Sequence, residues 1–427
     1  MRARARIVAQ AGMLALLAGA SGAVPAGVPE AERFWPQWRG PLNSGEAPHA
    51  RPPLEWGEGR NVRWKVEVPG LGLGSPIVRG DMVLVSSAVP GEKDPAARDF
   101  VVVALDRKDG KQRWRSVLHS EVPHEGKHDH NSFASASLLT DGKRFYAYFG
   151  SRGLYALDLS GKLLWEKQLG KMQTRNGFGE ATSPALYGDT LVVTWDHEGP
   201  DFMVALDAAS GKERWRKERD EPTTWATPLV VTGEGAPQVV VAGTNRVISY
   251  DLATGEERWR AGGLTPNAIP SPVYGDGIVY VTSGFRGNAL QAIRVSAAKG
   301  EVASPPALVF RYDKDTPYVP SPLLYKGQLY FLKSNSGVLT AIDAKDGTLR
   351  FSERLEAVPN VYASPVGAAG RVYVTGREGT VAVLAAGPKL ELLATNRLDD
   401  GFDASPALVD REIYLRGRKH LYRISAD

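Results

Sequence analysis

The sequence predicts an all-β fold, an eight-bladed β-propeller of four-stranded antiparallel blades that is closed by a strand from the N-terminal part of the chain. Three observations predict it: an internal repeat that occurs eight times, short apolar runs joined by tight turns within each repeat, and one strand-like segment that stands outside the repeats. Repeats of about 40 to 50 residues built from short strands are typical of propellers, whose radially arranged sheets cover one another's faces.

Each repeat opens with a Ser-Pro dipeptide or a close variant, at intervals of 41 to 60 residues. A short apolar run follows, then a turn such as Gly275-Asp276, then an alternating run such as Ile278 to Val281. This pattern predicts two strands joined by a tight turn. The eight openings begin at Ser75, Ser135, Ser183, Thr227, Ser271, Ser321, Ser364 and Ser405.

The second half of a repeat adds a third run that ends in a motif such as Ala205-Leu206-Asp207, a glycine turn and an aromatic residue. Each repeat is therefore a four-stranded meander. We expect the aromatic side chain of the fourth strand to pack between blades, because burial of one such ring contributes roughly 1.5 to 3 kcal/mol or more. The tryptophans to which we assign this structural role are Trp64, Trp114, Trp165, Trp215 and Trp259.

The last repeat ends at Leu421 to Ile424, before a fourth strand can form. The segment Val62 to Val66, which precedes the first repeat, has the pattern of an orphan fourth strand with Trp64 as its aromatic residue. We expect it to complete the last blade, because this closes the ring and removes an unpaired strand edge.

The pattern of Ala205-Leu206-Asp207, Gly211-Lys212-Glu213 and Trp215 resembles the W-motif of the PQQ-binding-like, or quinoprotein-type, propeller family. The resemblance covers residues 60–427 and implies eight blades with the first strand innermost. Repeats five and seven depart from the pattern, since repeat five carries an insertion around Arg294, Gly300 and Phe310, and repeat seven has Leu384 where Asp is usual. We expect those two blades to pack less regularly.

The beginning of the chain has the layout of a signal peptide over residues 1–26. Three arginines at positions 2, 4 and 6 precede an apolar stretch from Ile7 to Ala20, which is shorter than the roughly 20 residues that a membrane span needs. We expect cleavage after Ala23 or Ala26 and a periplasmic or secreted protein. Residues 27–59 would form an N-terminal extension that packs on the propeller of residues 60–427, or that docks a partner, because Phe34 to Pro41 is rich in aromatic residues.

Composition excludes several classes of protein. The 427 residues include no cysteine, which rules out disulfides, thiolate metal sites, covalent c-type haem and a lipid anchor on an N-terminal Cys. The formal charge of +4 falls to +1 when the three leader arginines are removed, so nothing in the charge favours a nucleic-acid partner. We expect a monomer without a transmembrane segment in the mature chain.

Alternate connections of a meander lie on the same face, so the long loops of all blades gather around one mouth of the central channel. Polar and aromatic residues concentrate in these loops, which is where binding residues usually lie. The candidate ligand-binding residues are His128, His130, Asn131, Arg175, Asn176, Asp196, His197, Trp225, Asn267, Arg286, Tyr318 and Asp403.

Each candidate also has a structural interpretation. His128, His130 and His197 could hold a divalent metal, although their spacing matches no known ligand signature and hydrogen-bonding loop histidines are the commoner case. Arg175 and Arg286 could clamp an anion or brace neighbouring loops. Asp196, Glu198 or Asp403 could act as a general acid or base, or could be solvated or ion-paired carboxylates. Trp195, Trp225 or Tyr318 could stack on a ligand, or could pack between loops.

We expect an exported protein that binds or scaffolds in the cell envelope through its long-loop face, with a protein or a small polar ligand as partner. The family's periplasmic outer-membrane assembly propeller is the model for this hypothesis, although this chain lacks the Cys of its lipid anchor. An enzyme or a carbohydrate-binding protein that uses the polar mouth is the alternative. A PQQ-dependent dehydrogenase is less favoured, because such enzymes often carry an adjacent Cys pair and a calcium-binding set of acid and amide residues. We therefore expect no cofactor, and a divalent metal stays open.

Overall fold

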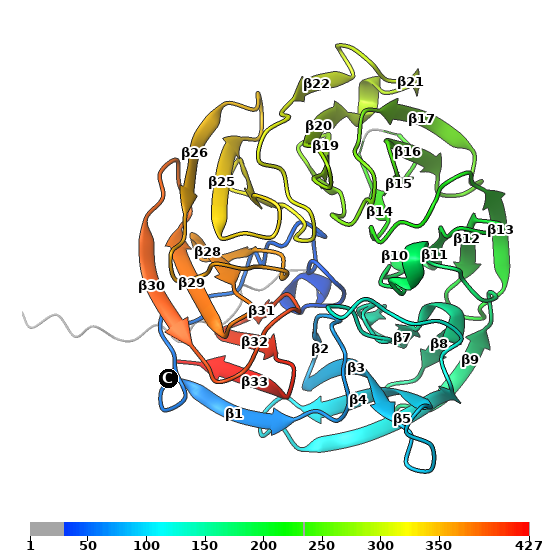
Figure 1. The fold of residues 1–427 in the computed structure, drawn as a ribbon, viewed down its shortest axis with the longest axis vertical. Coiled ribbons are helices and arrows are strands. Elements are labelled where there is room, and N and C mark those ends of the chain that lie inside the picture. The colour runs from blue at the N-terminus through cyan, green and yellow to red at the C-terminus, as the bar shows by residue number, and fades with distance from the viewer. Residues whose placement is uncertain (1–29, 234, 427) are drawn as a thin grey trace, which may run out of the picture.

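The computed structural model describes residues 30–233 and 235–426, so the predicted signal peptide lies outside the described residues. The described residues form eight antiparallel sheets arranged in a ring, with little helix, which confirms the predicted fold class (Figure 1). Over the same ranges, no helix is long and apolar enough to cross a bilayer. Contacts between the first strands of neighbouring blades show that these strands are innermost.

Six of the blades are built from four strands that follow one another in the chain. In blade 5 a short extra strand intervenes before the outer strand and joins the sheet of blade 4, and the outer strand of the last blade comes from the beginning of the described chain. Blades 1 to 4 contain β2 (Ile77–Arg79), β3 (Met82–Pro90), β4 (Arg98–Asp106) and β5 (Gln112–Glu121); β6 (Leu139–Thr140), β7 (Phe145–Tyr148), β8 (Leu154–Leu157) and β9 (Leu163–Lys167); β10 (Ala185–Tyr187), β11 (Thr190–Trp195), β12 (Phe202–Asp207) and β13 (Glu213–Glu218); and β14 (Leu229–Val231), β15 (Gln238–Ala242), β16 (Arg246–Asp251) and β17 (Glu257–Gly262). Blades 5 to 8 contain β18 (Val273–Gly275), β19 (Ile278–Ser283), β20 (Ala289–Arg294) and β22 (Leu308–Arg311); β23 (Leu323–Tyr325), β24 (Gln328–Leu332), β25 (Val338–Asp343) and β26 (Leu349–Arg354); β27 (Val366–Ala368), β28 (Arg371–Thr375), β29 (Thr380–Ala385) and β30 (Leu392–Arg397); and β31 (Ala407–Val409), β32 (Glu412–Arg416), β33 (His420–Ser425) and β1 (Val62–Glu67).

Four of the W-motif tryptophans join their blade to the next one at the outer rim. The indole N–H of Trp165 donates to the carbonyl of Ala208 in the following blade at 3.2 Å, and its ring covers Gly211. Gly211 has φ +68°, and a Cβ there would lie 2.7 Å from the Trp165 ring, so only glycine is accommodated. The same donation runs from Trp64 to Arg107, from Trp114 to Leu159 and from Trp215 to Leu252.

The ring closes as the sequence predicts. Strand β1 pairs antiparallel with β33, with Lys65 opposite Tyr422 and Val66 opposite Leu421. Trp64 packs on Tyr414 of its own blade, with ring centroids 6.0 Å apart. The last blade therefore has four strands like the others, although its outer strand lies more than three hundred residues away from the other three in sequence.

Blades 5 and 7 are the irregular ones. The insertion in repeat five forms η4 (Val295–Ala297) and β21 (Gly300–Glu301), which pairs in parallel with the outer strand β17 of blade 4. This extra strand covers Trp259, which is fully buried and donates to Gln238 Oε1 at 2.9 Å instead of to the next blade. Phe310 occupies the aromatic position of blade 5, where its ring lies against Gly347 of the next blade.

Blade 7 has Ala394 at the position that is aromatic elsewhere. Trp56, from the segment that precedes β1, supplies the missing ring: it stacks on Tyr373 with centroids 6.4 Å apart and an interplanar angle of 23°. Its backbone N–H donates to Asn396 Oδ1 at 2.8 Å, which fixes it on the outer strand of blade 7. The irregular repeat is thus completed by a side chain from outside the repeats.

A second repeated contact runs around the inner wall. In the first seven blades the backbone N–H of the opening Ser or Thr donates to the hydroxyl of the corresponding residue in the next blade. In the second repeat this residue is Ser137, which accepts from Ser75 at 2.9 Å, so the opening expected at Ser135 lies two residues too early. The seven donations join Ser75, Ser137, Ser183, Thr227, Ser271, Ser321, Ser364 and Ser405 in that order.

Residues 34–56, which we call the strap, cross the channel at its tight-turn end, following η1 (Glu30–Arg33) (Figure 1, dark blue). Trp35 exchanges two backbone hydrogen bonds with Val78 in blade 1. The buried Arg39 donates to the carbonyls of Pro322 at 2.6 Å and Pro365 at 2.8 Å, in blades 6 and 7. The strap therefore ties blade 1 to blades 6 and 7, which are not its neighbours in the ring.

Candidate functional site

The central channel holds a cavity of about 420 Å³ on the long-loop side, above the strap. All eight connections that lead into the inner strands contribute to its lining, together with Phe285 from the connection between β19 and β20 and Trp38 of the strap. A volume of this size is within the roughly 300–1,000 Å³ typical of small-molecule sites. The lining residues that carry the site are Trp38, Ser75, His128, His130, Asn131, Ser137, Phe178, Ser183, Trp225, Thr227, Asn267, Phe285, Tyr318, Tyr362, Ser364, Asp403 and Ser405.

Two groups of aromatic rings form the walls. On one side Phe178, His128, His130 and Tyr362 contact one another edge to face, with successive centroids 5.2 to 5.5 Å apart. Elsewhere in the lining Phe285 stacks on Tyr318 at 5.1 Å. Such contacts favour particular orientations of the rings beyond what burial alone would do.

Hydrogen bonds fix the tautomers of the two histidines. His128 Nδ1 accepts the backbone N–H of His130 at 3.1 Å, so the neutral ring carries its proton on Nε2. His130 Nδ1 lies 2.8 Å from the Tyr362 hydroxyl and 3.5 Å from the Arg377 guanidinium, which has no acceptor atom, so it too accepts. Burial, with the nearby Arg377, lowers the pKa of His130 below its usual range and keeps the ring neutral near pH 7.

The acidic and amide acceptors of the cavity are already engaged. Asp403 receives Arg377 on one oxygen and Arg418 on the other. Asn131 Oδ1 accepts from Ser132 N at 2.8 Å and from Ser135 Oγ at 2.6 Å. Asn267, at φ +56°, accepts the Arg175 guanidinium at 2.9 Å. Protein donors therefore hold these three side chains in fixed orientations.

The structure brings together seven of the predicted candidates in this cavity: His128, His130, Asn131, Trp225, Asn267, Tyr318 and Asp403. Five others lie outside it. Arg175 acts behind the wall by holding Asn267, and its guanidinium also lies 3.4 Å from Glu198. Asn176 lies beside it in η3 (Arg175–Gly177), and the Arg286 guanidinium lies over the ring of Phe285, 5.1 Å from its centroid.

Asp196 and His197 have structural partners instead. Asp196 is buried and binds Arg219 through both oxygens, at 2.7 and 3.0 Å, and Thr224 at 2.7 Å. His197 is buried, with Nδ1 accepting two backbone N–H groups and Nε2 3.0 Å from the carbonyl of Pro200. The structure therefore does not place His197 with His128 and His130, and the three do not form a joint metal site.

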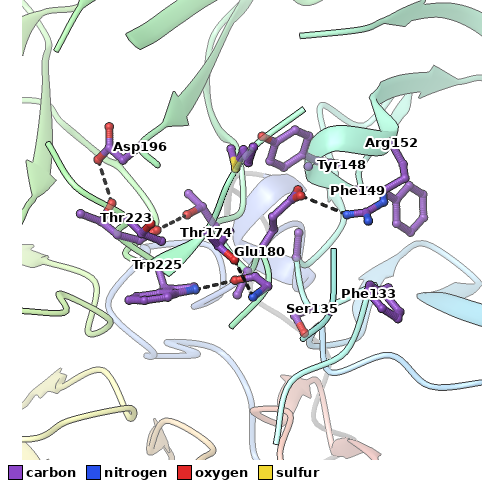
Figure 2. Close-up of a pocket in the computed structure, with 18 residues that line it drawn as sticks. Phe133, Ser135, Tyr148, Phe149, Arg152, Thr174, Glu180, Asp196, Thr223 and Trp225 are labelled. Atoms are coloured by element: carbon purple, nitrogen blue, oxygen red, sulfur yellow. Dashed lines mark hydrogen bonds and ion pairs between the residues drawn. The ribbon is translucent and has the colours of Figure 1, made fainter. Parts of the chain in front are cut away.

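A polar network behind the cavity wall holds the loops of blades 2 to 4 in place (Figure 2). Arg152 reaches Glu180 at 3.0 Å and Glu121 at 3.0 Å, and Glu180 also accepts both the N–H and the hydroxyl of Ser151. Burial raises the pKa of Glu180 above its usual range, against the opposing effect of Arg152. The space among these residues is only about 20 Å³, room for about one water molecule.

Within the described part of the chain, the three-residue group that could hold a metal ion is His124, Glu125 and Glu180. In the structure these side chains are bonded to the guanidinium of Arg152 and to neighbouring protein groups. Arg152 already donates to Glu180, and its guanidinium lies 3.4 Å from His124 Nδ1, while His124 Nε2 is 2.7 Å from the carbonyl of Met172. Glu125 accepts both Thr174 N and Thr174 Oγ1. The guanidinium thus stands where an ion would be needed.

The fold and the cavity together define the class: a W-motif β-propeller of eight blades with a ligand-sized cavity at the long-loop mouth of its channel. A family model described as outer membrane protein assembly factor BamB matches residues 57–199, 171–305 and 200–427. The chain belongs to this family, which confirms the predicted relationship to PQQ-like propellers. A comparison with curated protein sequences finds no match.

Solved structures show the same architecture at low sequence identity. BamB from Moraxella catarrhalis superimposes with a TM-score of 0.59 and 13% identity, covering 85% of this chain and 98% of that one. A europium-containing methanol dehydrogenase gives 0.67 and 12%, covering 93% and 99%. The quinohemoprotein alcohol dehydrogenase from Comamonas testosteroni gives 0.60 and 12%, covering 92% and 80%. At this identity the likeness shows the fold alone.

The residues of the cavity do not match what a quinone cofactor and its metal ion need. A hard cation takes several carboxylate and amide oxygens, whereas the oxygens of Asp403, Asn131 and Asn267 are bonded to protein donors. The carboxylates of PQQ would need cationic partners, and the guanidinium of Arg377 is held by Asp403. No adjacent Cys pair exists in the sequence.

Proposed function

We propose that the protein is an exported binding protein of the cell envelope that recognises a small polar ligand in the central cavity, and that it works without a quinone cofactor. The observation that carries this proposal is the convergence of all eight inner loops and Trp38 on one cavity of about 420 Å³. A channel that served only as the axis of a scaffold would need neither oriented aromatic walls nor a floor. The predicted signal peptide supports export.

The test is ligand-dependent stabilisation of the mature protein, beginning near Gly27. Thermal unfolding is followed with a panel of neutral saccharides, sugar acids, amino acids and PQQ with calcium. A ligand at 100 times its dissociation constant stabilises the folded state by about 2.7 kcal/mol, which is readily measured. Ile269→Trp, which fills the cavity, should abolish the shift, and Leu163→Trp on the outer rim should leave it unchanged.

The family description supports a second candidate, a scaffold that docks other proteins on the long-loop face. This function uses the tips of the loops and not the cavity between them. It predicts that no member of the panel stabilises the protein, and that Ile269→Trp has no effect on the retention of envelope proteins by the immobilised protein. The two candidates are thus separated by one substitution.

A further inference from the structure

We infer that Arg377 and Arg418 form an anion-binding site at the rim of the cavity, and that the ligand is a ring that carries a single carboxylate. The ring occupies the cavity and the carboxylate meets the two guanidiniums. This inference deepens the proposed function and rests on it. The arginines that the sequence suggested for anion binding, Arg175 and Arg286, lie outside the cavity lining.

The two arginines occupy equivalent positions in neighbouring blades. Each is the second residue after the second strand of its blade, β28 in blade 7 and β32 in blade 8, and each follows a glycine. The backbone N–H of Arg377 donates to the carbonyl of Asn360 at 3.0 Å, and that of Arg418 to the carbonyl of Gly401 at 2.9 Å. The fold thus fixes both arginines in connections of the long-loop face.

One carboxylate holds both guanidiniums through their Nε atoms. Arg377 Nε donates to one oxygen of Asp403, and Arg418 Nε donates to the other at 2.9 Å. Among the described residues, the Nη atoms of the pair have no acceptor apart from His130 Nδ1, which lies 3.5 Å from Arg377 Nη1. No second carboxylate in that part of the chain forms an ion pair with either guanidinium. The ends that pair best with a carboxylate are therefore open to a ligand.

This arrangement leaves a net positive charge in a partly buried place. The side chains of Arg377 and Asp403 are 9% and 5% exposed, and that of Arg418 is 44% exposed. A brace between two loops needs one guanidinium for one carboxylate, and an unmatched second one loses hydration without gaining a counter-charge. A single ligand carboxylate supplies that counter-charge, whereas PQQ would bring several.

The pair lies where the cavity meets a side groove, a hollow of about 730 Å³ on the long-loop face. Arg377 and Arg418 line the side groove, while His130 and Asp403 line both the groove and the cavity. The guanidinium of Arg377 also lies over the ring of Tyr362 in the cavity wall, 4.0 Å from its centroid. A carboxylate at the pair can therefore belong to a molecule whose ring lies in the cavity.

The other charged residues of the side groove do not neutralise the pair. Asp400 is engaged, because it accepts backbone N–H groups of its own connection and of the one that carries Arg418. The remaining charged groups are exposed, so solvent and salt screen them. They are the carboxylates of Asp129, Glu378 and Asp399 and the cations of Arg397 and Lys419.

The positive charge also reaches the cavity wall. Burial has the largest effect on the pKa of His130, which it lowers, and on the pKa of Tyr362, which it raises. In both, the next largest effect is the charge of Arg377, which lowers the pKa and outweighs the opposite effect of Asp403. The wall on this side therefore favours an anion.

The rest of the cavity suits a ring of either of two chemistries. The opening Ser and Thr residues offer hydroxyls that can both donate and accept, as the edges of a sugar ring require. The stacked pair of Phe285 and Tyr318 offers an apolar surface, as an aromatic ring requires. The chemistry that a sugar acid and an aromatic acid share is a ring with one carboxylate.

The experiment is isothermal titration calorimetry of the mature protein with two pairs of probes, glucuronate with glucuronamide and benzoate with benzamide. Within each pair the ring is the same and the negative charge is removed. We expect one carboxylate to bind at least tenfold more tightly than its amide, and the pair in which it does so distinguishes a sugar acid from an aromatic acid. Raising the salt concentration from about 0.05 M to about 0.5 M should weaken the binding of the carboxylate and not that of the amide.

Substitutions test whether the two arginines carry this preference. Arg418→Gln and Arg377→Gln should each weaken the carboxylate at least tenfold and leave the amide unchanged, and thermal unfolding shows whether the variants are folded. Arg418 is the more exposed of the two, so its loss disturbs the fold less. Arg260→Gln is the matched control, since Arg260 has a similar exposure of 41% and pairs with Glu257 on the outer rim. It should bind normally.

Amides that bind as tightly as their carboxylates, or a carboxylate whose binding survives Arg418→Gln, would overturn the inference. If neither acid binds while another compound of the panel gives a shift that Ile269→Trp abolishes, the anion site is wrong and the proposed function stands. If no compound stabilises the protein and the retention of envelope proteins ignores Ile269→Trp, the proposed function itself fails.

Discussion

The outer rim and the central cavity are built by opposite rules. At the rim one contact repeats: an indole N–H on a carbonyl of the next blade and a ring over a glycine, as in Trp114, Trp165 and Trp215. In the cavity the opening Ser or Thr recurs, but the loops that precede it contribute side chains that differ from blade to blade, and Trp38 comes from a segment outside the repeats. The rim therefore specifies the ring, and the cavity is free to specify a ligand.

The rim and the inner wall also differ in the hydrogen bonding of their buried polar groups. Four rim tryptophans donate to a neighbouring blade, and Trp56 replaces the ring that blade 7 lacks. Near the inner wall, by contrast, the buried Ser75 hydroxyl has no hydrogen-bond partner among the described residues. A buried hydroxyl without a partner is a local departure of the kind that is common at functional sites.

The largest effect is expected at the rim. Trp259→Ala should lower the free energy of unfolding by about 3 to 5 kcal/mol, because the ring is fully buried under β21 and its removal leaves a cavity and takes away one of the two hydrogen bonds to Gln238 Oε1. Urea unfolding measures the change. Tyr187→Ala, on an exposed side chain, should change it by less than about 0.5 kcal/mol. A loss similar to that of the control would mean that the rim does not hold the ring together.

A slightly smaller effect tests whether Trp56 has the same role as the repeat tryptophans. Trp56→Ala should cost about 3 kcal/mol, since the ring is 5% exposed and stacks on Tyr373, but its indole N–H has no partner to lose among the described residues. The same urea series measures it. The double variant with Tyr373→Ala should lose less than the sum of the single losses, because the two residues are in contact. Strict additivity would contradict the assignment.

The opposite sign is expected near the centre. Arg416 is fully buried, its three guanidinium nitrogens have no hydrogen-bond partner among the described residues, and burial lowers its pKa to about 10. Arg416→Met should raise the free energy of unfolding by about 1 to 3 kcal/mol, because an unpaired buried charge is replaced by a side chain of similar length. Arg107→Met is the matched control and should destabilise, since Arg107 binds Glu412 and Asp410. A loss of stability in both variants would show that Arg416 has a partner.

The smallest effect is the pH dependence of the rim turns. Hydrogen bonds from Arg214 and Ser210 lower the pKa of Asp207 to about 2, and Arg113 similarly lowers that of Asp106. A carboxyl with a depressed folded-state pKa contributes stability above its unfolded value of about 3.9, and that contribution is lost as the pH falls through the folded value. Thermal unfolding between pH 5 and pH 2 should therefore show a decline that Asp207→Asn reduces. High salt should also reduce it, because the pairs are exposed.

Most of the fold could be predicted because its determinants repeat. The Ala-Leu-Asp, glycine and Trp positions recur at blade spacing, and Trp64 in an orphan strand had one vacant place to occupy. The second repeat was placed at Ser135 instead of Ser137, since several serines stand together there and only the hydrogen bond from Ser75 distinguishes them. The sequence does not predict that Trp56 supplies the aromatic ring missing at Ala394, because no local pattern connects the two segments.

The site was predictable only where loop position decides it. Residues just before an inner strand, such as Tyr318 and Asp403, converge on the channel in any such propeller. Asp196 and His197 lie in equally polar sequence, but both are buried, where Asp196 pairs with Arg219 and His197 accepts backbone N–H groups. For Trp38 the sequence predicts packing on the propeller. Its place in the cavity lining could not be predicted, because the other lining residues lie far along the chain.

Closure by β1 on β33 has a consequence for the order in which the molecule forms. A chain that emerges N-terminus first presents the strap and β1 long before their partners in blades 6, 7 and 8 exist. Single blades bury little on their own, and contacts between distant segments form late. The ring should therefore remain open until its last strand is available, and such a chain stays threadable through a narrow pore throughout its synthesis.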